Sequence, residues 1–165
     1  MKKSLFTIIV LLVLMLLSSC DPYLTMYVEN RTDRNIIPFL IEYHVGNNDI
    51  VLPAKLDDKT VEYLTKFYLA TPQESTECFS VEGLFSWREY WPNEIDTLHL
   101  FILDADTLQK YGWEEGVERG NMLLQRYDLG IAYLDDMERA SWVYYPPTSQ
   151  MAFFVKMWPP YNFDE

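Results

Sequence analysis

Three carboxylates near the middle of the chain are the residues best suited to chemistry. Asp104 and Asp106 are two positions apart, so in an extended segment their side chains point to the same side, and Glu114 follows eight residues later. Two carboxyl groups about 5–9.5 Å apart can act as an acid and as a base or nucleophile in glycoside hydrolysis. The alternative is structural, because Asp106 or Thr107 can form a turn and cap a helix. The structural alternative is the one that we favour.

Other chemically capable groups are few. His44 and His99 lie in separate predicted strands, and the sequence contains no Gly-x-Ser-x-Gly motif. Two isolated histidines and one thiol are poor material for a zinc site, so we expect no metal and no cofactor. His99 lies in an apolar segment and is expected to be a hydrogen-bonded structural residue, and Cys78 a buried thiol. We therefore predict that the protein is not an enzyme.

Aromatic residues are abundant, with 9 Phe, 5 Trp and 12 Tyr, which is more than one core of this size requires. An exposed group of them can stack against sugar rings or anchor a protein partner. The candidates for such a binding surface lie in residues 85–92 and in the tail: Trp87, Tyr90, Trp91, Trp158 and Tyr161. Trp87 and Trp91 share a face in either a helix or a strand, and burial in the core is the competing expectation.

The charge of the chain limits its partners. The formal net charge is −12 at pH 7. Nucleic-acid binding requires Lys and Arg that displace counterions from phosphates, so a nucleic-acid partner is disfavoured. Anionic headgroups are disfavoured for the same reason, whereas a neutral glycan, a cation or a protein remains compatible.

The first twenty residues indicate where the protein resides. Lys2 and Lys3 precede an apolar run from Leu5 to Leu17, which is typical of a secretory signal peptide. Thirteen residues at 1.5 Å each are too short to span about 30 Å of hydrocarbon. The run ends in Leu17-Ser18-Ser19-Cys20, which resembles the lipobox of bacterial lipoproteins.

This resemblance implies that residues 1–19 are removed and that Cys20 is acylated. Several acyl chains would hold the protein at a membrane durably. Residues 20–23 would then form a tether of about 10 Å, followed by a single globular domain over residues 24–165. Acylation leaves Cys78 as the only free thiol, so no intramolecular disulfide is expected. Asp21-Pro22-Tyr23 does not resemble an acidic export signal, which favours the periplasmic face of the outer membrane over the cell surface.

The elements that must position these residues are mainly strands. Residues 24–29 and 35–44 read as a β-hairpin, and Pro38 places the second strand at an edge or a bulge. Residues 96–103 are the clearest strand, and three further extended segments are expected at 122–127, 142–145 and 152–158. Helices are expected over 107–111, ending at Gly112, and over 131–139, whereas the pattern of residues 61–68 fits a helix or a strand. These patterns predict a β-sandwich of immunoglobulin-like character with one or two short helices between 105 and 140. An α+β fold is the alternative.

The order of elements from residue 98 to residue 146 resembles that of small uncharacterised envelope lipoproteins of Gram-negative gut bacteria. The matching residues are Asp104, Asp106, Thr107, Tyr111, Trp113, Tyr127, Leu134, Trp142, Tyr145 and Pro146. The resemblance implies location and fold but no catalytic residue. We therefore expect a lipid-anchored, non-catalytic binding or accessory protein for a glycan or protein partner. A small carboxylate-dependent hydrolase and a structural subunit of an envelope assembly are the alternatives.

Overall fold

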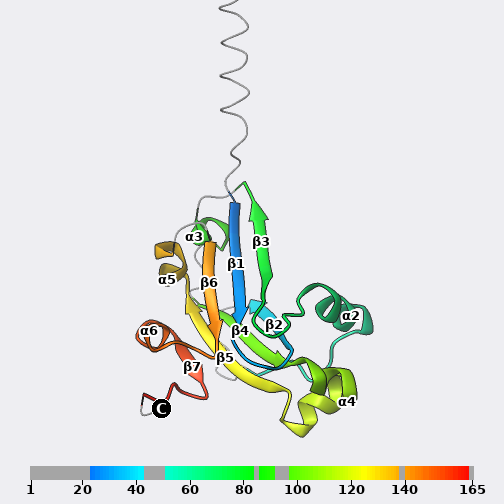
Figure 1. Cartoon of the computed structure of the whole chain (residues 1–165). Coiled ribbons are helices and arrows are strands. Elements are labelled where there is room, and N and C mark those ends of the chain that lie inside the picture. Colours follow the sequence, from blue (N-terminus) through cyan, green and yellow to red (C-terminus); the bar gives the residue numbers. More distant parts are fainter. Residues whose placement is uncertain (1–22, 43–50, 84–85, 92–96, 138–139, 164–165) are drawn as a thin grey trace, which may run out of the picture.

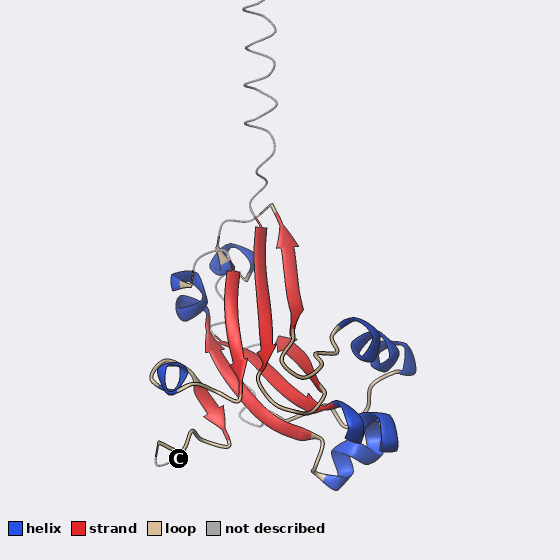
Figure 2. Cartoon of the chain, in the orientation of Figure 1, coloured by secondary structure: helices blue, strands red, loops and turns tan. Residues whose placement is uncertain are grey.

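Seven strands and several short helices make up the part of the chain that the computed structural model describes, which is residues 23–42, 51–83, 86–91, 97–137 and 140–163 (Figures 1 and 2). The first sheet has the strand order β3-β1-β6 and the second the order β2-β4-β5-β7. The strands are β1 (Tyr23–Asn30), β2 (Ile36–Glu42), β3 (Ser75–Glu82), β4 (Thr97–Asp104), β5 (Leu123–Gly130), β6 (Ala140–Tyr145) and β7 (Lys156–Trp158). The helices are α2 (Asp58–Phe67), α3 (Trp87–Tyr90), α4 (Ala105–Arg119), α5 (Ile131–Asp136) and α6 (Ser149–Ala152). The predicted mainly-β sandwich with inserted helices is confirmed.

Strand β1 is the centre of the first sheet. It pairs antiparallel with β3 and parallel with β6. Alternation along β1 places Leu24, Met26 and Val28 in the core, where each is at most 1% exposed. The opposite face of the strand carries the half-buried Tyr27 and Glu29. The first sheet therefore has one apolar face against the second sheet and one face that is partly open.

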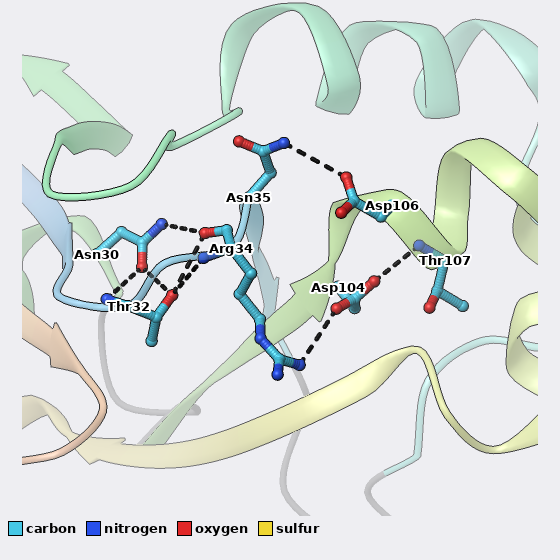
Figure 3. Close-up of polar contacts among 7 residues, drawn as sticks. All are labelled: Asn30, Thr32, Arg34, Asn35, Asp104, Asp106 and Thr107. Carbon is cyan, nitrogen blue, oxygen red and sulfur yellow. Dashed lines mark hydrogen bonds and ion pairs between the residues drawn. The ribbon is translucent and has the colours of Figure 1, made fainter.

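The predicted hairpin of β1 and β2 is wrong, because the two strands belong to different sheets. Asn30 explains how the turn between them is held. Its side-chain amide donates hydrogen bonds to the carbonyl oxygens of Arg34 at 2.7 Å, Ala70 at 3.0 Å and Thr71 at 3.1 Å. Its Oδ1 accepts from the hydroxyl of Thr32 at 2.7 Å (Figure 3). The turn is thus tied to a segment forty residues further along the chain and carries the chain from one sheet to the other.

Strand β4 lies in the interior of the second sheet, between β2 and β5. All six residues from Leu98 to Leu103 are buried. One face, which includes Leu100, packs into the core between the sheets, and the other, which includes Phe101, packs into a second core with residues of α2 and α4. The predicted strand over 96–103 is confirmed. Pro38 lies in β2, an edge strand of this sheet, as predicted, where a missing N–H is tolerated.

The helices differ from the expectations in their limits. The ambiguous segment 61–68 lies mostly in α2. The first helical part of α4 ends at Gly112 as predicted, because the φ of 71° and ψ of −177° at this glycine are not helical, and a second helical part, which was not predicted, continues after the kink to Arg119. Helix α5 confirms the helix that was predicted from Ile131, although it ends at Asp136. The strand predicted over 152–158 is only three residues long, because α6 and a turn occupy the residues before it.

Candidate binding surface

No two of the three candidate carboxylates, Asp104, Asp106 and Glu114, are arranged as a catalytic pair. Asp104 caps α4: its Oδ1 accepts from the backbone N–H of Thr107 at 2.7 Å, and its Oδ2 lies 3.5 Å from Nη1 of Arg34 (Figure 3). The cap is therefore Asp104 and not Asp106 or Thr107, which corrects the sequence prediction. The side chain of Asp106 accepts from Asn35 at 3.3 Å, as Figure 3 also shows.

Glu114 lies on the surface of α4 and pairs with another residue. Its Oε1 is 3.4 Å from Nζ of Lys55, and the Glu114 side chain is 62% exposed. Asp106 lines a cavity of about 450 Å³ beside α2, and neither Asp104 nor Glu114 is among its lining residues. The geometry thus gives each carboxylate a separate structural partner and offers no support for a hydrolase that uses them together.

Cys78 and His99 have structural environments. The thiol of Cys78 is 5% exposed and donates to the carbonyl oxygen of Met26 at 3.5 Å. Burial raises the pKa of Cys78 to about 12, so the thiol is protonated at neutral pH. His99 is 6% exposed, and its Nδ1 lies 2.8 Å from Oδ1 of Asp128 on the neighbouring strand. These two expectations are confirmed, whereas His44 and Cys20 lie outside the described residues.

Trp87 and Trp91 lie in the core. They are 0% and 5% exposed, and their rings stack on each other with centroids 5.7 Å apart. Both rings also contact Phe79 of β3, at 5.3 Å and 5.1 Å. The shared face that the spacing predicts does exist, but it points inward, so the two tryptophans do not belong to an exposed surface. Of the three aromatic candidates in this segment, Tyr90 is the one that reaches solvent, with 37% of its surface exposed.

The tail candidates do reach the surface, and further aromatic residues surround them. Trp158 is 45% exposed and Tyr161 is half-buried. Around α6 lie Phe153, Phe154 and Phe163, which are 75%, 65% and 62% exposed. We call the group the α6 surface: Tyr133, Phe153, Phe154, Trp158, Tyr161 and Phe163.

Ring contacts join five members of the α6 surface in two groups. Phe153 lies 5.8 Å from Phe163, and Phe163 lies 4.8 Å from Tyr161. Tyr133 of α5 stacks with Phe154 at 5.9 Å. Sequence reasoning missed the three phenylalanines. The adjacent pair Phe153-Phe154 was an available signal. In the predicted strand, neighbouring side chains point to opposite faces of the sheet, so one of the two rings would lie on the face away from the core.

Contacts with β5 and with the core fix the position of the α6 surface. The guanidinium of Arg126 lies 3.7 Å from the centre of the Trp158 ring, and Nε of Arg126 lies 3.1 Å from Asp128. The amide of Gln125 donates to the carbonyl oxygen of Pro159 at 2.7 Å. Met151, 4% exposed, fixes α6 to the core. The aromatic side chains therefore project from a short segment that is fastened to β5 and to the core.

Two cavities flank α6. The larger, of about 370 Å³, lies beside β7 and the tail and is lined by Ala152, Val155, Lys156, Met157, Trp158, Pro160, Tyr161 and Phe163. The smaller, of about 230 Å³, lies between α5, β6 and α6 and is lined by Tyr133, Met137, Trp142, Tyr144, Thr148, Gln150, Met151 and Phe154. Both are mainly apolar with a few polar groups, which is the usual character of ligand sites.

Comparisons with protein-family models, with curated proteins and with solved structures found no match for this chain. Within the described residues, no three His, Cys, Asp or Glu side chains are grouped so that they could hold a metal ion. No helix in the same part of the chain has the length and apolar character needed to cross a membrane. The functional argument therefore depends on the α6 surface and on the motif at Cys20.

Proposed function

We propose that the protein is a lipid-anchored, non-catalytic binding or accessory module of a bacterial cell envelope, which contacts a glycan or protein partner through the α6 surface. The observation that carries this proposal is the cluster of exposed rings around α6. Exposed apolar groups gathered in one place are uncommon on monomeric proteins and mark interaction sites, whereas single exposed rings are ordinary. Phe153, Phe154 and Phe163 are each more than 60% exposed; Phe153 and Phe154 are adjacent in the chain, and Phe153 contacts the ring of Phe163.

The attachment part of the proposal is supported by the lipobox-like residues that end in Cys20. Strand β1 begins at Tyr23, so a tether of about 10 Å would join the lipid to the domain. Metabolic labelling with an alkyne analogue of palmitate tests this part. Label is expected on the wild-type protein, and a Cys20→Ser variant that retained the label would contradict acylation at this residue.

The position of the α6 surface indicates from which side the partner approaches. Strand β6 runs parallel to β1, so that Thr25 pairs with Ala140 and Asn30 with Tyr145. Seven residue steps of about 3.3 Å separate Tyr23 from Asn30, or roughly 23 Å. Helix α6 follows β6 and lies beyond it in Figure 1, at about the level of the far end of β1. A protein tethered at Cys20 would thus present the α6 surface well away from the lipid.

Photo-crosslinking in native envelopes tests this function. A benzophenone amino acid replaces Phe153 or, as the control, Phe67 of α2, which is 54% exposed and lies outside the α6 surface. We expect a discrete adduct of higher mass from position 153 that disappears when the protein also carries Phe154→Ser and Phe163→Ser. Equal adducts from positions 153 and 67, or none from position 153, would contradict the proposal.

A further inference from the structure

The smaller cavity beside α6 has an aromatic wall that its neighbours hold in place. The Trp142 ring stacks on Tyr27 of β1, with centroids 4.8 Å apart and an angle of 21° between the planes. Tyr144, two residues further along β6, lies under the guanidinium of Arg31, which is 3.9 Å from the ring centre. Trp142 and Tyr144 line the cavity, whereas Tyr27 and Arg31 do not. The two rings are therefore supported from outside the cavity and present their remaining surface to it.

Uncharged polar groups surround this wall. The hydroxyl of Thr148 accepts from the N–H of Met151 at 3.2 Å and keeps its own proton to donate. The amide of Gln150 is exposed and has no hydrogen-bond partner within the described part of the chain. Partial burial, with the nearby Tyr144, raises the pKa of Tyr133, so its phenol remains neutral. The cavity thus offers donors and acceptors from α5, β6 and the start of α6.

The combination of rings and uncharged polar groups defines the chemistry of a ligand. One face of a pyranose ring presents C–H bonds, which pack against the electron-rich face of an aromatic ring, and its hydroxyls both donate and accept hydrogen bonds. Among the described residues that line the cavity there is no Asp, Glu, Lys or Arg, so none of these side chains compensates a ligand charge. Its volume of about 230 Å³ is below the ~300–1,000 Å³ typical of sites for drug-sized ligands, which suits one ring.

We infer that the cavity between α5, β6 and α6 binds a single neutral sugar ring, the terminal residue of a glycan. The ring lies against Trp142, and the amide of Gln150 and the hydroxyl of Thr148 hydrogen-bond to its hydroxyl groups. This inference rests on the proposed function and makes it more specific, because it identifies the partner as a carbohydrate and not a protein. Phe154 and the other exposed rings of the α6 surface then contact the following part of the glycan.

Sugar titrations test this inference directly. The mature full-length protein, in a detergent without a sugar headgroup, is titrated with glucose, galactose, mannose, N-acetylglucosamine and N-acetylgalactosamine and followed by saturation-transfer NMR. We expect at least one of them to bind with a Kd on the order of 1 mM, as is usual for so small a ligand. Glucuronic acid and glucosamine are expected to bind at least fivefold more weakly than that sugar.

Two variants and one control variant locate the binding. Gln150→Ala changes an exposed side chain and should weaken binding at least fivefold, while Gln109→Ala, an exposed glutamine on α4, should leave it unchanged. Trp142→Phe keeps a ring in the sheet and should weaken binding as well. Absence of binding by all five neutral sugars, equal binding by the charged ones, or equal effects of Gln150→Ala and Gln109→Ala would overturn the inference. A protein adduct from position 153 without sugar binding would overturn it and leave the proposed function standing.

Discussion

Replacement of Asp104 separates a structural from a catalytic role for the carboxylate that the sequence makes most suggestive. Asp104→Ala removes the cap of α4, whose hydrogen bond to Thr107 N is 2.7 Å long. Loss of such a cap costs about 0.5–2 kcal/mol, typically ~1. The ion pair with Arg34 adds little, because its atoms are 3.5 Å apart and the Arg34 side chain is 51% exposed. We therefore expect Asp104→Ala to lower the free energy of unfolding by about 1–2 kcal/mol.

Asp104→Asn isolates the two contributions, since asparagine caps a helix about as well as aspartate but carries no charge. Asp104→Asn should lower the free energy of unfolding by less than about 0.5 kcal/mol. The control Asp136→Ala changes an exposed carboxylate at the C-terminal end of α5, where a negative charge does not stabilise a helix, and should not lower the stability. Urea denaturation measures these differences, and a protein of this size should lose about 2–4 °C of melting temperature per kcal/mol. An Asp104→Ala variant as stable as Asp104→Asn would refute the capping role.

Three further predictions concern burial and charge. Cys78 should not react with a thiol reagent at pH 8 in the folded protein and should react fully in urea, because burial raises its pKa to about 12. Trp87→Ala should destabilise the domain by about 3–5 kcal/mol in the same denaturation assay, whereas Phe153→Ala, at a 75% exposed side chain, should cost less than about 0.5 kcal/mol. Thr60 donates to the carboxylate of Asp57 and lowers the pKa of Asp57, so the stability that this charge contributes is present above the ordinary pKa and is lost as the pH falls. Asp57→Asn should therefore flatten the dependence of stability on pH below about pH 4, and an unchanged slope would contradict this reasoning.

Features fixed by neighbouring residues could be predicted from the sequence. Strand β4 is apolar at every position from Leu98 to Leu103 except His99, and such a run indicates a strand covered on both faces. Pro38 cannot donate to a neighbouring strand, which restricted β2 to an edge or a bulge, and β2 is an edge strand. These inferences needed no knowledge of which segments meet in space.

Pairing between distant segments could not be predicted in this way. The turn after β1 contains residues typical of a hairpin, yet the bonds of Asn30 to Ala70 and Thr71 direct the chain to the other sheet. Spacing likewise indicated that Trp87 and Trp91 share a face but not which way that face points. Both rings pack against Phe79 of β3, so the shared face points into the core. This contact between a strand and a separate helix could not be read from the spacing of the tryptophans.

The candidate surface was found only in part for the same reason. Trp158 and Tyr161 were identified from residue type, but the phenylalanines beside them were assigned to a strand that is shorter than the pattern indicates. The helix α6, capped by Thr148, turns Phe153 and Phe154 outward. A four-residue helix next to a short strand leaves too weak a periodic signal to be recognised.

Hydroxyl-radical footprinting tests the central claim most directly, because it requires no knowledge of the partner. Oxidation of Phe153, Phe163, Tyr63 and Phe67 is measured by mass spectrometry in the purified protein and in native envelopes, and all four side chains are at least 50% exposed. We predict strong protection of Phe153 and Phe163 in the envelope and unchanged oxidation of Tyr63 and Phe67 on α2. Equal oxidation of Phe153 and Phe163 in both samples would contradict the proposal that the α6 surface is a binding surface.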